Sequence, residues 1–206
     1  MKKIFTLFAA AAAFTFGSIN SASAQVEQGT VIIDPYYGYP NFGKKFADGI
    51  VGDSATNVDI TVIGPCGLRG EYMISDNFGV GVDFIYNSLG VKYNYEDWDT
   101  LGISHTYEDK INQQRFRVQL RMNYHFAQTE QVDAYVGFGA GTNIRRFSYS
   151  SDNPNFTEPD AVSGALIPVS LRIALGVRYY FTDFLGINAE IGLGGPMISG
   201  GISLKF

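Results

Sequence analysis

A strict two-residue alternation of apolar and polar side chains runs through residues 115–126 and limits the folds open to this chain. Odd-numbered positions carry arginine, glutamine, asparagine or histidine, and even-numbered positions are apolar or aromatic: Phe116, Val118, Leu120, Met122, Tyr124 and Phe126. Because successive side chains of a β-strand point to opposite faces, this segment predicts a long strand with one apolar and one strongly polar face. A helix would scatter the same arginines around its whole circumference.

Two-faced segments of this kind recur along the chain. They lie near residues 30–39, 58–75, 78–87, 133–145, 170–181, 185–194 and 202–206. With the first segment they make about eight strands, most of them long enough for the ~9–11 residues that a tilted strand needs to cross a bilayer.

The connections between these segments alternate in length. Short turns are expected near 75–77, 127–131, 182–183 and, rich in glycine, 194–200. Longer polar stretches are expected as loops near 40–57, 94–112 and 150–163. Short turns on one rim and long loops on the other are typical of membrane barrels. The sequence therefore predicts an all-β fold, an eight-stranded antiparallel up-and-down transmembrane β-barrel.

The start of the chain is typical of a secretory signal peptide. Lys2 and Lys3 precede an apolar run that ends near Phe16, and Ala22-Ser23-Ala24 forms a small-residue cleavage pattern. The run is too short for a membrane anchor, since a spanning helix needs ~20 apolar residues. We predict a signal peptide at 1–24 and one barrel domain at 25–206.

The polar faces of the strands carry charges of both signs. The inward set is predicted to contain Asp34, Arg69, Glu71, Asp83, Arg115, Arg117, Arg121, Asp133, Arg145, Arg172, Arg178, Glu190 and Lys205. An eight-stranded barrel is just wide enough for side chains to fill it. Because desolvating an unpaired ion costs several kcal/mol, most of these groups should form a paired network. The network then rigidifies the core; alternatively, it gates a narrow water path or selects anions.

An aromatic belt is expected on the lipid face at the rim of the short turns. If both chain ends are periplasmic, the ends of even strands and the starts of odd strands meet at this rim. The aromatic residues there are Tyr72, Phe78, Tyr124, Phe126, Tyr179, Phe181 and Phe206. Such belts place amphipathic rings at the level of the lipid headgroups.

A water-soluble up-and-down barrel of the lipocalin type is the competing fold. The two folds differ in which face lies inside, and the soluble form would turn the arginines and carboxylates to water. The signal peptide and the continuous apolar face favour the membrane form. Coordinates that direct four apolar side chains toward the axis would overturn it: Val118, Leu120, Leu175 and Ile191.

The chain resembles the family of small outer-membrane β-barrels, porin-like proteins that include the OmpA membrane domain and OmpX. The resemblance covers most of the mature chain and rests on the signal peptide, the alternating strands, Asp34-Pro35-Tyr36-Tyr37-Gly38-Tyr39-Pro40-Asn41 and the closing Ile202-Ser203-Leu204-Lys205-Phe206. It implies a Gram-negative outer-membrane location, contact with outer-membrane lipid and lipopolysaccharide, and recognition of the closing strand by the barrel-assembly machinery. Because the chain stops at Phe206, no peptidoglycan-binding domain is expected.

No catalytic, cofactor or metal site is expected. His125 lies on the inward face, where a structural hydrogen bond is expected, and Ser104-His105 lies in an acidic polar stretch. Adjacent Ser and His rarely reach the geometry that a nucleophile and its base need. The single Cys66 rules out an internal disulfide, and a net charge of −5 argues against a nucleic-acid partner. We expect a monomeric, non-enzymatic structural or surface-contact protein; a narrow porin-like channel for small solutes, or a lipid-modifying enzyme, is the alternative.

Overall fold

The computed structural model describes residues 26–41, 55–98, 102–157 and 168–206. The predicted signal peptide at 1–24 therefore lies outside the described residues. Nine strands are assigned within the described ranges: β1 (Val31–Tyr39), β2 (Thr56–Ser75), β3 (Phe78–Trp98), β4 (Ser104–Gln128), β5 (Val132–Thr142), β6 (Ile144–Ser151), β7 (Val169–Tyr180), β8 (Leu185–Leu193) and β9 (Ile198–Lys205). The described residues contain no helix that is long and apolar enough to cross a membrane.

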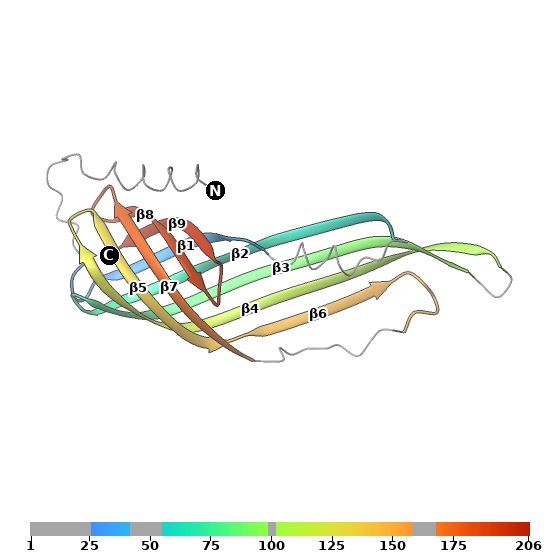
Figure 1. Cartoon of the computed structure of the whole chain (residues 1–206), viewed down its shortest axis with the longest axis horizontal. Coiled ribbons are helices and arrows are strands. Elements are labelled where there is room, and N and C mark those ends of the chain that lie inside the picture. The colour runs from blue at the N-terminus through green and yellow to red at the C-terminus, as the bar shows by residue number, and fades with distance from the viewer. Residues whose placement is uncertain (1–25, 42–54, 99–101, 158–167) are drawn as a thin grey trace.

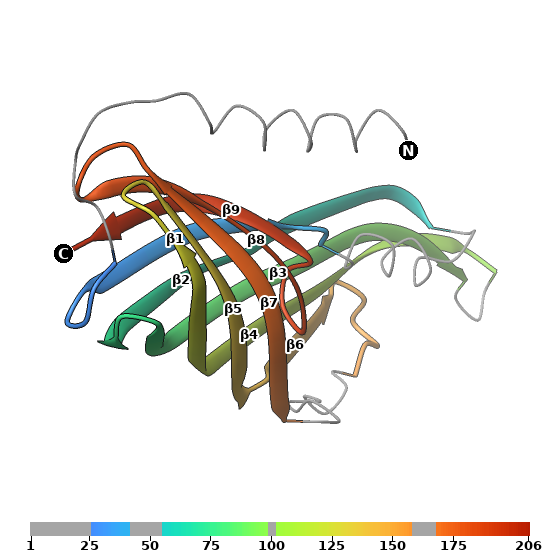
Figure 2. The same cartoon turned by 60° about the vertical axis from the view of Figure 1, so that its left-hand side comes forward.

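The strands close into a ring of eight (Figure 1; Figure 2). The strands β1 to β5 pair antiparallel in chain order, β5 pairs with β7, and β7, β8 and β9 again pair in chain order. β9 pairs back with β1, where Ile33 lies opposite Leu204. β6 continues β5 past Asn143 and pairs with the same neighbour, β4, so these two strands occupy one place in the ring. Closure pairs the strand edges that would otherwise be exposed to lipid. The predicted eight-stranded antiparallel up-and-down barrel is confirmed.

Four strands continue beyond the ring as a tall sheet. β2, β3, β4 and β6 extend past the short β8–β9 turn, on the right in Figure 1. The predicted loop at 94–112 is therefore wrong: residues 94–98 and 104–112 are strand, and the β3–β4 register continues through Tyr95 opposite Tyr107 to Trp98 opposite Ser104. Both faces of this part are polar or mixed, so the contrast that reveals a two-residue period is absent there. Residues 99–101 lie outside the described residues.

The outer surface of the ring is apolar. Leu120 is 72% exposed, and Val118, Leu175 and Ile191 also point outward. On β4 the apolar outward positions run from Phe116 to Phe126, and polar outward residues continue the same face at Gln114, Asn112 and Lys110. This apolar length matches the ~9–11 residues of a tilted membrane strand, so it defines the membrane-spanning part of the barrel.

The interior is filled by large side chains packed over glycines. A β-carbon on Gly67 would collide with the Tyr36 ring, and one on Gly176 would collide with the Tyr135 ring. Glycine at these two inward positions therefore makes room for the two rings. At the short-turn end the interior is closed by a small apolar cluster that the alternation did not predict, made of Val26, Ile32, Met73 and Tyr180.

Candidate functional site

The ion pairs nearest the short turns form a cluster around Arg178, here called the Arg178 cluster. Its guanidinium binds three carboxylates, with N–O distances of 2.9 Å to Asp34, 2.6 Å to Glu71 and 2.9 Å to Asp133. His125 completes it, with Nδ1 2.6 Å from Asp133 and Nε2 3.0 Å from Glu71. An imidazole can donate to both acceptors only when both ring nitrogens are protonated. In that doubly protonated form the histidine is a second cation beside Arg178, among three carboxylates.

Glu190, 1% exposed, organises the next cluster along the barrel, here called the Glu190 cluster. Its carboxylate accepts hydrogen bonds from three guanidinium groups and from the Tyr135 hydroxyl; the guanidinium groups belong to Arg69, Arg121 and Arg172. Asp83 adds a second carboxylate, 3.2 Å from Arg121 and 2.7 Å from the Tyr36 hydroxyl. This cluster holds three cations and two carboxylates, so the two clusters together balance five cations with five carboxylates.

Three arginines at the long-loop end lie outside this balance. The mouth arginines, Arg115, Arg117 and Arg145, form no ion pair with a carboxylate among the residues that the structure describes. Arg115 donates instead to the Asn143 side chain at 2.7 Å, and Arg117 donates to the Gly194 carbonyl at 3.0 Å. The predicted paired network thus exists, but it does not include these three arginines.

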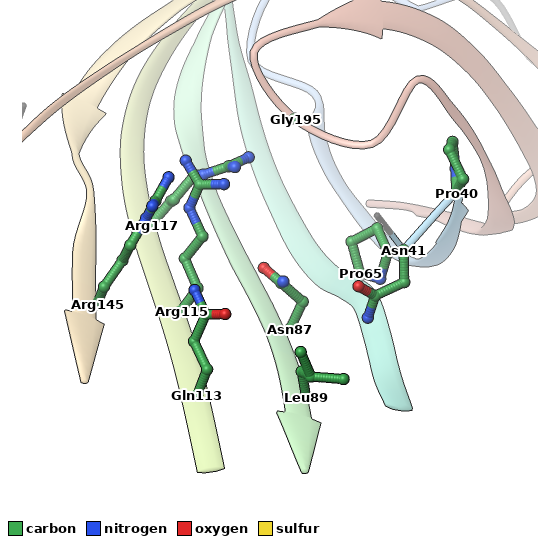
Figure 3. Close-up of a pocket in the computed structure, with 10 residues that line it drawn as sticks. All are labelled: Pro40, Asn41, Pro65, Asn87, Leu89, Gln113, Arg115, Arg117, Arg145 and Gly195. Atoms are coloured by element: carbon green, nitrogen blue, oxygen red, sulfur yellow. The ribbon is translucent and has the colours of Figure 1, made fainter. Parts of the chain in front are cut away.

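The mouth arginines line a cavity of about 290 Å³ that opens at the long-loop end of the lumen (Figure 3). The arginines come from β4 and β6, and Asn87 and Leu89 of β3 lie between them and Pro65 of β2. No side chain of the Arg178 cluster or the Glu190 cluster lines this cavity. The cavity therefore ends above the two balanced clusters.

The remaining predicted lumen residue and the aromatic belt lie where the alternation places them. The Lys205 amine is buried at the short-turn end, 4.8 Å from the centre of the Tyr180 ring. Of the predicted belt, Tyr179 is half-buried and donates a hydrogen bond to Gln131 at 3.4 Å. The other six belt residues are exposed on the outer surface at the short-turn end: Tyr72, Phe78, Tyr124, Phe126, Phe181 and Phe206.

The candidate catalytic pair is not assembled. Ser104 and His105 are adjacent in β4, so their side chains point to opposite faces of the sheet. The Ser104 hydroxyl donates to Glu96 at 3.4 Å, and the His105 ring stacks on Tyr107 with centroids 6.2 Å apart. Within the described ranges, no group of three or more His, Cys, Asp or Glu side chains is placed to hold a metal ion.

Above the apolar band, polar clusters tie the tall sheet together. The Tyr93 and Tyr149 hydroxyls both donate to Asp109, and burial together with this hydrogen bond raises the pKa of Tyr149. On the opposite face, Glu108 lies 2.6 Å from the Lys92 amine and 2.8 Å from the Lys110 amine. Hydrogen bonds from Lys110 and Lys92 lower the pKa of Glu108 below its ordinary value. The sequence did not reveal these contacts, because they depend on the strand register.

Comparisons with known proteins found solved structures that are similar to the chain. The N-terminal β-barrel domain of Pseudomonas aeruginosa OprF has 16% sequence identity and a TM-score of 0.49, and the match covers 87% of this chain and 99% of that chain. P. aeruginosa OprG has 17% identity and a TM-score of 0.46, with 90% of this chain and 99% of that chain covered. Yersinia pestis Ail, in complex with the heparin analogue sucrose octasulfate, has 15% identity and a TM-score of 0.45, with 87% of this chain and 99% of that chain covered. No curated protein sequence matches the chain.

The family comparison covers most of the chain. The sequence profile of the outer membrane protein beta-barrel domain matches residues 8–197. This match agrees with the closed ring of strands and with its apolar outer surface. The chain therefore belongs to the outer membrane protein β-barrel domain family and is a β-barrel protein of the outer membrane.

Proposed function

We propose that this protein is a non-enzymatic envelope protein with a closed lumen, which acts as a structural element of the outer membrane and makes contacts through its tall sheet. The observation that carries the proposal is the position of Glu190. Its carboxylate joins guanidinium groups from β2, β4 and β7 in the middle of the lumen. Side chains from these three strands therefore meet at one point, and the Arg178 cluster lies between that point and the short turns.

The non-enzymatic part of the proposal rests on the geometry of Ser104 and His105. The two side chains lie on opposite faces of β4, so the histidine is not placed to accept the serine proton. An enzymatic role predicts that lipid extracts are altered by the wild-type protein and not by His105→Ala. We expect neither protein to alter them.

The contact part of the proposal rests on the tall sheet above the apolar band. Its end carries Trp98, which is 66% exposed, and a pair of tyrosine rings, Tyr95 and Tyr107, with centroids 5.9 Å apart. Exposed aromatic side chains are favoured anchors at protein interfaces. Cells that carry Trp98→Ser should adhere less to a polystyrene surface than cells that carry the wild type at equal surface abundance, and equal adherence would count against the contact role.

The same proposal assigns the orientation and the partners. The short turns and both chain ends face the periplasm, and the tall sheet faces the medium. The apolar band contacts lipid, and the outward polar residues above it contact lipopolysaccharide. The closing strand β9, with its terminal Phe206, is the segment that the barrel-assembly machinery reads. The chain acts as a monomer and binds no nucleic acid.

Planar-bilayer conductance of the purified full chain tests the closed lumen. We expect no steady open level for the wild type under conditions in which an unrelated porin conducts. Arg121→Ala is the informative variant, because Arg121 covers Gly137 and Gly139 and contacts both Asp83 and Glu190. Brief openings in this variant alone would support the proposal. Reproducible open levels in the wild type would overturn it.

A narrow pore for small solutes or ions is the second candidate, and the cavity at the long-loop end favours it. This candidate requires water to pass between Arg121 and Glu190, whose nitrogen and oxygen atoms are 2.9 Å apart. The same conductance measurement separates the two functions, since a pore lined by the mouth arginines would conduct in the wild type and prefer anions.

A further inference from the structure

We propose that the cavity at the long-loop end of the lumen is a binding site for a doubly charged tetrahedral oxyanion of the phosphate or sulfate class, held by Arg115, Arg117 and Arg145. The site is separate from the closed-lumen role, because it lies above the clusters that close the barrel.

The first argument is the placement of like charges in the strand register. Arg115 of β4 lies directly opposite Arg145 of β6, and Arg117 lies two residues along β4 on the same inward face. Directly opposed side chains have β-carbons about 4.5–5.5 Å apart, and like charges in this arrangement destabilise a sheet. Three guanidinium groups are thus gathered against their mutual repulsion, and an anion between them would remove that cost.

The second argument is the absence of a compensating charge. The five carboxylates of the Arg178 and Glu190 clusters are balanced by the five cations in those clusters. Among the described residues, none of the three mouth arginines pairs with a carboxylate, and the Nε atoms of Arg117 and Arg145 are buried without a hydrogen-bond acceptor. Buried Nε atoms without an acceptor also occur at Arg69 and Arg121 of the Glu190 cluster, so the argument rests on the three guanidinium charges that no described carboxylate neutralises.

The third argument is room for the anion. The cavity of about 290 Å³ is several times the ~30 Å³ that one water molecule occupies in the liquid, so it can hold a polyatomic anion together with water. Figure 3 shows the three arginine side chains gathered on one side, with the Asn87 amide beside them. Planar guanidinium groups bind phosphate and sulfate oxygens in pairs, which a chloride ion cannot match.

Isothermal titration calorimetry on the refolded full chain in zwitterionic detergent tests the site. Sodium phosphate and sodium sulfate are titrated at constant ionic strength, with sodium chloride making up the balance. We expect saturable binding of one phosphate or sulfate per chain, and no saturable heat when chloride is the titrant. Equal heats for all three salts would mean general screening and would overturn the proposal.

Variants identify the residues involved. Arg117→Gln and Arg145→Gln should each weaken phosphate binding about ten-fold or more, because each removes charge-assisted hydrogen bonds. Arg146→Gln is the matched control: Arg146 follows Arg145 on β6 but lies outside the barrel over the Phe116 ring, so binding should be unchanged. Unchanged affinity in both Arg117→Gln and Arg145→Gln would overturn the assignment.

Thermal unfolding of the same proteins separates a lost site from a lost fold. Without phosphate, Arg145→Gln should unfold at the same or a higher temperature than the wild type, because it relieves repulsion from Arg115. Phosphate should raise the unfolding temperature of the wild type more than that of Arg145→Gln, since a ligand stabilises the state that binds it and the variant binds it more weakly. An equal rise in both proteins would contradict the proposed site.

Discussion

Tyr135 and Gly176 face each other across the β5–β7 pairing, and the Tyr135 ring fills the space that a β-carbon on Gly176 would need. From this position the Tyr135 hydroxyl donates to Glu190 at 3.0 Å and accepts from Arg69 at 2.8 Å. The guanidinium of Arg178 stacks on the same ring, 4.4 Å from its centre. One aromatic ring therefore joins the Arg178 cluster to the Glu190 cluster, and a missing side chain on the neighbouring strand allows it to do so.

Replacing Gly176 tests whether the Tyr135 ring must occupy this space. Gly176→Val should lower the free energy of unfolding by about 2 kcal/mol or more, because overpacking of a filled core typically costs ~1–3 kcal/mol and the displaced Tyr135 hydroxyl loses its partners. Urea unfolding in lipid vesicles, followed by heat-modifiable gel migration, measures the change. Gly70→Val is the control, since nothing lies within 4 Å of a β-carbon at Gly70. Equal stabilities for the two variants would contradict the packing described here.

Glu190 should be the most costly carboxylate to remove. Glu190→Ala leaves Arg69, Arg121 and Arg172 buried with Asp83 as the remaining carboxylate of their cluster. Breaking a buried ion pair on one side typically costs about 3–5 kcal/mol. We expect a loss of this size in equilibrium unfolding, against less than about 1 kcal/mol for Glu130→Ala on an exposed turn. A loss below 1 kcal/mol for both would mean that the cluster is dispensable.

The apolar band predicts a position-dependent cost of charge on the outer face of β4. Leu120→Arg places a guanidinium in the middle of the band and should destabilise the protein by about 2–4 kcal/mol in lipid. Asn112→Arg lies on the same face of the same strand above the band, so its cost should be close to zero. Unfolding in vesicles of defined lipid measures both. An equal loss of stability at the two positions would show that the membrane boundary does not lie between them.

Glu108 predicts an effect at acid pH. Hydrogen bonds from Lys110 and Lys92 lower its pKa, so its contribution to the tall sheet is present above the ordinary carboxyl pKa and is lost as the pH falls through the lowered value. A carboxyl-detected NMR titration should find the pKa of Glu108 below its ordinary value in the wild type. Lys92→Met should bring the pKa back up, and Arg146→Gln should leave it in place. If Glu108 had the same pKa in both variants, the lysines would not be the cause of its lowered pKa.

The alternation by itself determined the class of the fold. Between Arg115 and Phe126 each residue is assigned to a face by whether it is apolar, and the structure places Val118 and Leu120 outside and Arg117 and Arg121 inside. The same rule placed the acidic and basic lumen residues on one face and the aromatic belt on the other. It succeeded because lipid outside and a charged core inside give maximum contrast between successive side chains.

Where successive side chains differ little in polarity, the sequence was not sufficient to predict the strands or their faces. The strands within 94–112 have polar residues on both faces. They became evident only from the β3–β4 pairing in the structure, in which Tyr95 lies opposite Tyr107. Inward apolar residues such as Ile32 and Met73 were missed for a related reason: the lumen is charged in its middle but is closed by an apolar cluster at the short-turn end.

Only the tertiary structure decided which charges neutralise which. Arg178 and Asp34 are 144 residues apart, and Arg69 and Glu190 are 121 residues apart. A strand pattern states which face a side chain occupies, but the curvature and stagger of the closed ring set which faces meet across the lumen. That geometry gives Glu190 three arginines and leaves Arg115, Arg117 and Arg145 without a carboxylate among the described residues, a difference that no spacing along the chain encodes.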